Sequence, residues 1–140
     1  LVGSEMCIID RQAAISTTDA DFVVKLIDVW PDNTEYPGYQ MLVRGDIMRG
    51  RYRRSFSAPE PFTPGEPTEV AFTMPDIAHT FRKGHRIMVQ VQSSWFPLAD
   101  RNPQQFVDIY RCAASDFIPC DVRIYHDRRR PSRLEVLRLR

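Results

Sequence analysis

Short segments of alternating apolar and polar residues follow one another along the chain. In residues 87–93, isoleucine and valine alternate with methionine and glutamine, the period of two that is typical of a β-strand. Residues 69–74 show the same period, whereas residues 22–30 are apolar on both faces except at Lys25 and Asp28, which favours a strand near the middle of a sheet. Further strands are predicted at residues 5–16, 41–48, 122–126 and 133–139.

Turn residues separate these segments. Pro31, Asp32 and Asn33 predict a turn after the strand that ends at Trp30. Thr63-Pro64-Gly65 predicts a type II turn, and Arg82-Lys83-Gly84 predicts a turn in which Gly84 takes a positive φ. Residues 94–119 lack a clear period and indicate a long loop, with a helical turn predicted within residues 102–110.

The predicted fold is all-β. Roughly six to nine strands without a helix long enough to cover a sheet must bury their apolar faces against one another, and a sandwich or a barrel achieves this. The uneven strand spacing and the long loop favour a jelly-roll β-sandwich over an up-and-down barrel. We therefore expect residues 1–140 to form a single β-sandwich domain.

Length and charge narrow the classes of partner. The 140 residues suit one domain with a full core. The 19 Lys and Arg residues balance 18 Asp and Glu residues, whereas a protein that binds mainly nucleic-acid backbone usually carries a larger basic excess. Charged residues or glutamine interrupt every apolar run well before the roughly 18 residues that a membrane span needs. We predict neither nucleic acid nor a membrane as a partner.

The start of the chain indicates a piece of a longer protein. It begins at Leu1 rather than at methionine, and the charged and apolar regions of a signal peptide are missing from its first residues. The compartment therefore stays open.

Three cysteines are present, at positions 7, 112 and 120. Their spacings are too wide for a zinc knuckle or a redox pair. We expect free thiols packed as small apolar groups. A disulfide between Cys112 and Cys120 is the alternative.

The chain contains none of the common catalytic motifs. It lacks a GxSxG nucleophile elbow, a phosphate-binding loop, a GxGxxG and an HExxH. His79 and His85 could approach each other within a sheet, but no third zinc ligand stands out near them. We expect no metal, no cofactor and no catalytic residue in this chain.

Two aspartates, Asp19 and Asp21, precede the strand that begins at Phe22, and Asp28 and Asp32 follow. Carboxylates at a strand edge suit calcium, but the regular ligand spacing of a calcium loop is missing. We expect Asp19 and Asp21 to cap a turn into the strand instead.

Four arginines fall within residues 49–54. In an extended segment Arg49, Arg51 and Arg53 would share one face, where their guanidinium groups would suit phosphate or carboxylate. One interpretation is an anion or nucleic-acid patch with Tyr52 as a stacking surface. The balanced charge favours another, in which these arginines pair with the chain's own carboxylates or with a partner domain.

An apolar run followed by polar residues begins the long loop. It contains Trp95, Phe96, Pro97 and Leu98, then Asp100, Arg101 and Asn102. Four consecutive apolar residues exceed what a soluble loop normally exposes. We expect them to dock on another domain, with Asp100, Arg101 and Asn102 as a polar rim. There are two alternatives: these residues cover the end of the sandwich, or they stack on a sugar ring in a ligand cleft.

Several long segments together resemble one family of serine hydrolases. They are DADFVVKLIDVWP (19–31), GRYRRSF (50–56), FRKGHRIMVQVQSSWFP (81–97), DRNPQ (100–104) and, near the end, residues 124–127 and 131–132. The family contains cocaine esterase, the α-amino acid ester hydrolases, the glutaryl-7-aminocephalosporanic acid acylases and the X-Pro dipeptidyl peptidases. The likeness spans about residues 15–139. Residues 95–97 and 101–104 are most similar to the α-amino acid ester hydrolase branch.

The resemblance implies a jelly-roll of the galactose-binding-domain-like type. In such enzymes it follows an α/β-hydrolase domain and a helical cap, and the catalytic serine, acid and histidine belong to the hydrolase domain. The implied role is an accessory domain that buttresses the hydrolase domain, shapes the rim of its active site and contributes to contacts between copies of the chain. An independent carbohydrate-binding module is the alternative, and a nucleic-acid binder through residues 49–54 is a third.

Overall fold

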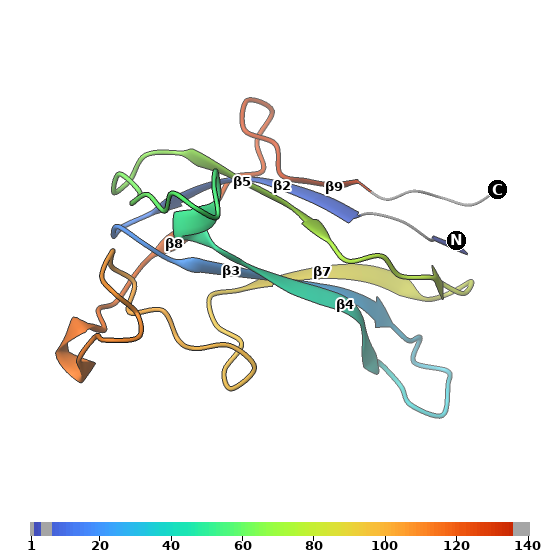
Figure 1. Cartoon of the computed structure of the whole chain (residues 1–140). Coiled ribbons are helices and arrows are strands. Elements are labelled where there is room, and N and C mark those ends of the chain that lie inside the picture. The colour runs from blue at the N-terminus through green and yellow to red at the C-terminus, as the bar shows by residue number, and fades with distance from the viewer. Residues whose placement is uncertain (1, 4–6, 136–140) are drawn as a thin grey trace.

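Two antiparallel sheets lie face to face in the computed structural model, which describes residues 2–3 and 7–135, with the side chains of residues 12–135 (Figure 1). One sheet contains β5 (Thr68–Met74) and β2 (Cys7–Ile15), with β8 (Val122–Ile124) and β9 (Arg133–Glu135) both paired to β2. The other has the order β4 (Gln40–Arg49), β3 (Asp21–Val29) and β7 (Arg86–Gln92). The expected β-sandwich is confirmed.

Smaller elements complete the described chain. β1 (Val2–Gly3) pairs with β6 (His79–Thr80), and two single-turn 3-10 helices occur at η1 (Gly50–Tyr52) and η2 (Ala114–Asp116). Within the described residues no helix has the length and apolar character needed to cross a membrane.

The core lies between the two sheets because alternate residues of each strand point inward. On β3 these are Phe22, Val24 and Leu26, which pack with residues of the other sheet. The buried core residues are Ala13, Ile15, Ala20, Phe22, Met48, Phe62 and Val70 in one cluster, and Val24, Leu26, Val43 and Met74 in a second.

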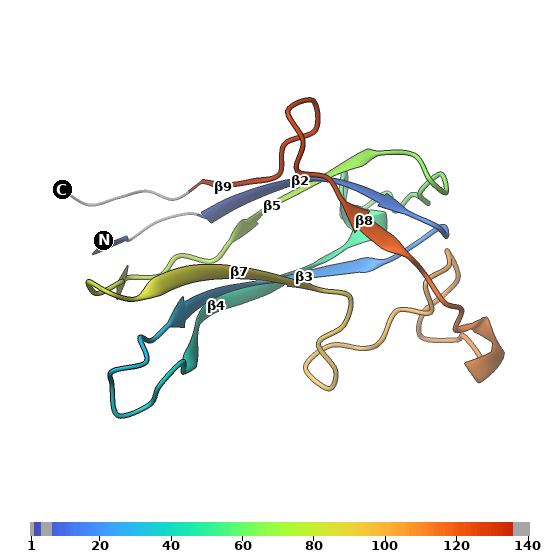
Figure 2. The ribbon, with the colours of Figure 1, turned by 180° about the vertical axis from the view of Figure 1, so that it is seen from behind.

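The opposite face of the β4–β3–β7 sheet points away from this core, and we call it the outer face. On β3 it carries Val23, Lys25 and Ile27, which alternate with the core residues. Cross-strand pairing places Ile47, Gly45 and Leu42 of β4 beside them, and Gln92, Gln90 and Met88 of β7. The long loop that follows β7 hangs below this sheet in Figures 1 and 2.

All seven predicted strands occur, with boundaries shifted by one to a few residues. The predicted continuation of the last strand over residues 136–139 lies outside the described residues. β1 and β6 were not predicted because two residues are too short to show a period.

The turns predicted at Gly65 and Gly84 are confirmed, whereas the prediction of a helical turn within residues 102–110 is wrong. Gly65 and Gly84 take φ values of 77° and 90°, as those turns require. By contrast, residues 102–110 form bends and a turn. Pro103 lacks an N–H to donate, and Gln104 has a left-handed φ of 68°, which interrupts a right-handed helix.

Cys112 and Cys120 are free thiols, so the alternative of a disulfide between them is wrong. The Cys112 thiol donates to the carbonyl of Ile109, and the Cys120 sulfur accepts a hydrogen bond from the Thr17 hydroxyl. The side chain of Cys7 lies outside the described residues.

Candidate functional site

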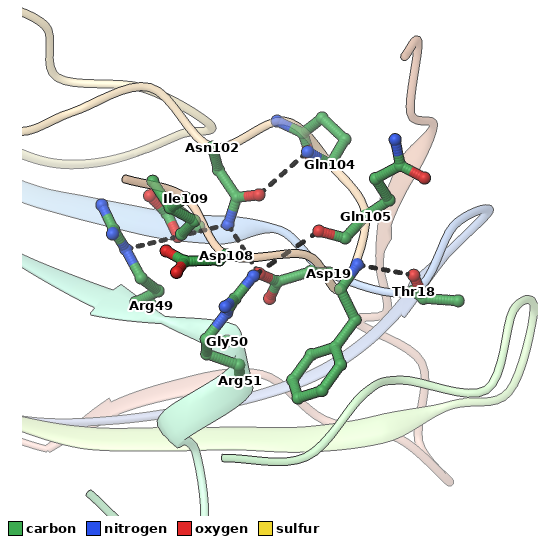
Figure 3. Close-up of polar contacts among 12 residues, drawn as sticks. Thr18, Asp19, Arg49, Gly50, Arg51, Asn102, Gln104, Gln105, Asp108 and Ile109 are labelled. Atoms are coloured by element: carbon green, nitrogen blue, oxygen red, sulfur yellow. Dashed lines mark hydrogen bonds and ion pairs between the residues drawn. The ribbon is translucent and has the colours of Figure 1, made fainter. Parts of the chain in front are cut away.

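A buried polar cluster forms where the start of β3 meets the end of β4 (Figure 3). Arg51 of η1 donates from Nε and Nη2 to Asp19 Oδ2, at 2.8 and 2.7 Å. Arg49, the last residue of β4, lies opposite Asp21 in the strand register, and its Nε is 3.4 Å from Asp21 Oδ1. Two carboxylates just before and at the start of a central strand therefore face two guanidinium groups from the neighbouring strand and turn.

Asn102 ties the long loop to this cluster. Its Nδ2 donates to Asp19 Oδ2 at 3.0 Å and to Asp21 Oδ1 at 2.8 Å. Its Oδ1 accepts from the backbone N–H of Gln104, and Arg49 donates to the carbonyl of Asp100 at 3.2 Å. The loop that follows β7 is thus held at its C-terminal end, at Asp100 and Asn102.

Burial decides the protonation behaviour of Asp21. Loss of hydration raises the pKa of this carboxyl above its ordinary value, although the Asn102 hydrogen bond and the charge of Arg49 act in the opposite direction. Asp19 is fully buried, and among the described residues its Oδ1 has no hydrogen-bond donor.

The cluster corrects the expectation that the two aspartates cap a turn. Asp19 and Asp21 do not cap a turn into β3, because their carboxylates bind Arg51, Arg49 and Asn102. Within the described residues no group of three or more His, Cys, Asp or Glu side chains is arranged to hold a metal.

The arginines do not share one face, because the segment after Arg49 is a 3-10 turn and not a strand. Arg53 turns away from the aspartates and donates to the carbonyls of Gly50, Glu60 and Pro61, with its guanidinium 4.0 Å from the centroid of the Phe62 ring. Pairing with the chain's own carboxylates, which the balanced charge favoured, holds for all four arginines. Arg49 and Arg51 pair with the two aspartates, and Arg53 Nη2 and Arg54 Nη1 lie 3.6 and 3.2 Å from Glu60 Oε1. Arg51 is only 8% exposed and is therefore unavailable to an external anion.

His79 and His85 do come together, on the carboxylate of Asp28. His79 Nε2 lies 3.0 Å from Asp28 Oδ2, and His85 Nδ1 lies 2.8 Å from Asp28 Oδ1. Each imidazole uses its own carboxylate oxygen, so the three side chains satisfy one another and join β3, β6 and the turn before β7. The sequence suggested the approach of the two histidines but not the aspartate between them.

Trp95 packs on the outer face. A side-chain Cβ at Gly45 would come within 2.6 Å of Trp95 Cη2, so the indole fills the space that the glycine leaves open. Lys25, the partner of Gly45 across the sheet, places its Nζ 4.6 Å from the centroid of the indole, a cation–π geometry.

The rest of the apolar run is exposed. Phe96 and Leu98 are 65% and 70% exposed, and the Arg101 guanidinium lies 5.8 Å from the Phe96 ring and 5.2 Å from the Phe117 ring. Asp100 and Pro97 are also exposed. Asn102, also predicted as a docking or rim residue, is only 4% exposed, and its amide binds Asp19 and Asp21.

Comparison with known proteins adds the family. Residues 10–135 match the family described as X-Pro dipeptidyl-peptidase C-terminal non-catalytic domain. The chain belongs to this family. The match covers the polar cluster, the outer face and the loop between them, so these features lie within a domain that does not itself catalyse.

Three relatives illustrate the likeness. Cocaine esterase of Rhodococcus sp. (strain MB1 Bresler) is 45% identical over 87 residues, which are 62% of this chain and 14% of that protein. An aminopeptidase from the marine sediment archaeon Thaumarchaeota archaeon superposes with a TM-score of 0.94 at 42% identity, over 98% of this chain and 23% of that one. An α-amino acid ester hydrolase superposes with a TM-score of 0.93 at 42% identity, over 97% and 23%. This domain thus spans about a quarter or less of each relative's length, and the comparisons give no support to an independent carbohydrate-binding module.

Proposed function

We propose that this chain is the accessory C-terminal domain of a longer serine hydrolase, and that it buttresses the catalytic part of that protein. The observation that carries the proposal is the match of residues 10–135 to a non-catalytic domain family, combined with coverage of only 23% of two structurally similar proteins. Residues 1–140 would form one domain of this longer chain.

The reaction of the longer protein would be cleavage of an ester or amide bond. The names of the relatives support this class, because they include an esterase, an amino acid ester hydrolase and an aminopeptidase. A serine nucleophile, a histidine base and an acid in the catalytic part would form and hydrolyse an acyl-enzyme. Acylase activity of the glutaryl-7-aminocephalosporanic acid type and a galactose-binding-like jelly-roll are finer proposals that follow from the sequence resemblance.

The contribution of this domain would be mechanical. The loop at residues 94–101 presents exposed Phe96 and Leu98 and is held by Asn102 and Arg49. A rigid apolar loop can support the rim of an adjacent active site with little loss of entropy on docking. The same surface could also contribute to contacts between copies of the protein.

The test compares the longer protein with a version that lacks this domain. We expect the truncated protein to lose thermal stability and turnover of an ester such as nitrophenyl acetate, and this chain alone to show no turnover. Unchanged stability and turnover after truncation would overturn the supporting role. A stoichiometric acyl-enzyme burst from this chain alone, or saturable quenching of its tryptophan fluorescence by oligosaccharides, would overturn the accessory assignment.

A further inference from the structure

We propose that the outer face of the β4–β3–β7 sheet, together with the loop at residues 94–101, is the surface that docks the catalytic part of the same chain, and that the docked surface carries carboxylates. The inference rests on the proposed function and adds to it the face and the chemistry of the partner.

The first argument is the apolar character of the face. Leu42, Ile27 and Met88 lie side by side across the three strands. Ile27 is only 4% exposed, so Leu42, which is 48% exposed, and the half-buried Met88 supply the exposed part of this row. The neighbouring row carries Trp95 over Gly45, and Phe96 and Leu98 project from the same loop. Several large apolar side chains exposed on one face mark an interaction site more often than they mark ordinary solvent-facing surface.

The other sheet supplies the contrast. On β5, Val70 and Met74 point into the core, so the alternate positions Glu69, Ala71 and Thr73 face outward. This row is mainly polar, as expected of a sheet face that water covers. Of the two outward faces, only that of the β4–β3–β7 sheet carries, within the described residues, an apolar row and an apolar loop together.

The second argument is charge. Lys25 lies on the outer face, Arg86 pairs with Val29 on that face, and Arg101 follows the apolar loop. Within the described part of the chain none of these three cations has a carboxylate at ion-pair distance. Asp21 belongs to the same face but is buried and bound to Arg49 and Asn102, and Asp100 is the exposed carboxylate of the loop. The margin of the apolar surface is therefore basic, which favours an acidic partner surface.

The third argument selects the occupant. The chain covers 23% of two structures that it matches at 42% identity, so these relatives contain about three quarters of their length beyond this domain. A partner of that size, joined covalently, has a high effective concentration at the domain surface. The held loop adds preorganisation, because Asn102 and Arg49 fix its end before any docking occurs.

The experiment is hydroxyl-radical footprinting of the longer protein. Phe96, Leu98 and the control Phe56 expose 65%, 70% and 81% of their surface in this domain. If nothing covers them, Phe96 should react like Phe56, and Leu98 at the lower rate of an equally exposed leucine. Phe56 stacks on Tyr52, beyond η1 and outside the outer face, and should stay reactive. We expect Phe96 and Leu98 to be protected several-fold relative to Phe56. Equal reactivity would overturn the proposed face.

Charge reversal tests the chemistry of the partner. Arg86→Glu and Arg101→Glu should each lower the melting temperature of the longer protein by several degrees, with a smaller shift at high salt. Thr73→Glu on the outward face of the other sheet is the matched control and should leave it unchanged. If the two Glu variants leave the melting temperature unchanged while Phe96 and Leu98 stay protected, the partner surface does not carry carboxylates. If the protection of Phe96 and Leu98 is lost on dilution, the occupant is a second copy of the protein instead.

The outcomes separate this inference from the proposed function. If removal of the whole domain leaves the enzyme unaffected, the supporting role fails. If removal destabilises the enzyme while Phe96 and Leu98 stay reactive, the supporting role stands and the outer face is not the docking surface.

Discussion

Arg51 and Asp19 form an ion pair that solvent barely reaches, with the side chains 10% and 0% exposed. Both donors of the guanidinium reach the same oxygen, Asp19 Oδ2, at 2.8 and 2.7 Å. Asn102 donates to that oxygen as well. One carboxylate oxygen therefore accepts hydrogen bonds from both η1 and the long loop and links them to the start of β3.

Removing the cation should be costly. Arg51→Met leaves the buried charge of Asp19 without its partner, and we expect a loss of about 3–5 kcal/mol in the free energy of unfolding, measured in urea. The double variant Arg51→Met with Asp19→Leu removes both charges and should recover much of that loss. A single variant that loses less than about 1 kcal/mol, as an exposed pair would, would contradict the buried-pair description.

Gly45 should not tolerate a methyl group. Alanine there would place Cβ 2.6 Å from Trp95 Cη2 and 3.3 Å from Lys25 Cγ. We expect Gly45→Ala to displace the indole, to shift the emission of Trp95 in a Trp30→Phe background, and to lose about 1–3 kcal/mol as overpacked sites do.

Gly65→Ala is the control for Gly45→Ala. The space around Gly65 is open, but its φ is 77°, so alanine there is strained without touching Trp95. Gly65→Ala should lower stability and leave the Trp95 emission unchanged. Equal emission spectra for both variants would show that the indole does not rest on Gly45.

Asp28 should contribute stability through the two imidazoles it joins. Asp28→Leu leaves His79 and His85 without their shared acceptor, and each unsatisfied group costs about 1–3 kcal/mol in the free energy of unfolding. Asp32→Leu, at an exposed position in the following turn, is the control and should change stability little in the same urea titration. Equal effects of the two variants would contradict the role of Asp28.

Asp21 should give an unusual pH dependence. Burial, the largest cause, raises the pKa of its carboxyl in the folded state, so the folded state holds a proton that the unfolded chain releases near its ordinary pKa of about 3.9. The contribution of Asp21 to stability is therefore fully present below that pH and is lost as the pH rises through the folded pKa. Relative to Asp21→Asn, the unaltered chain should lose free energy of unfolding as the pH rises above about 4.

Asp127 should change the free energy of unfolding with pH in the direction opposite to Asp21. Hydrogen bonds from Arg130 and from the backbone of Arg129 lower the pKa of this exposed carboxyl, so its contribution is present above the unfolded pKa and is lost as the pH falls through the folded value. In urea titrations, the unaltered chain should therefore lose free energy of unfolding relative to Asp127→Asn as the pH falls through the folded pKa. A common slope for both variants would contradict the assignment for Asp21.

Periodicity along the chain determined the strands and their buried faces. A period of two depends only on neighbours within one strand. The segment at residues 22–30, which is apolar on both faces, became the central strand β3. The turn at Gly84 was predictable as well, because glycine adopts a positive φ without steric cost whatever its neighbours are. The resemblance of long segments supplied the family, which the match over residues 10–135 confirms.

The site depended on contacts between segments far apart in sequence. Arg51 meets Asp19 across 32 positions and Asn102 meets it across 83, and no local pattern records such distances. The arginine spacing predicted one shared face because it assumed a strand, whereas a 3-10 turn rotated Arg51 toward Asp19 and Arg53 toward carbonyl groups. Only the pairing of β3 with β4 set Lys25 beside Gly45 and opened the space for Trp95. Chain topology, which brings distant residues within hydrogen-bond and van der Waals range, decided the polar cluster and the outer face.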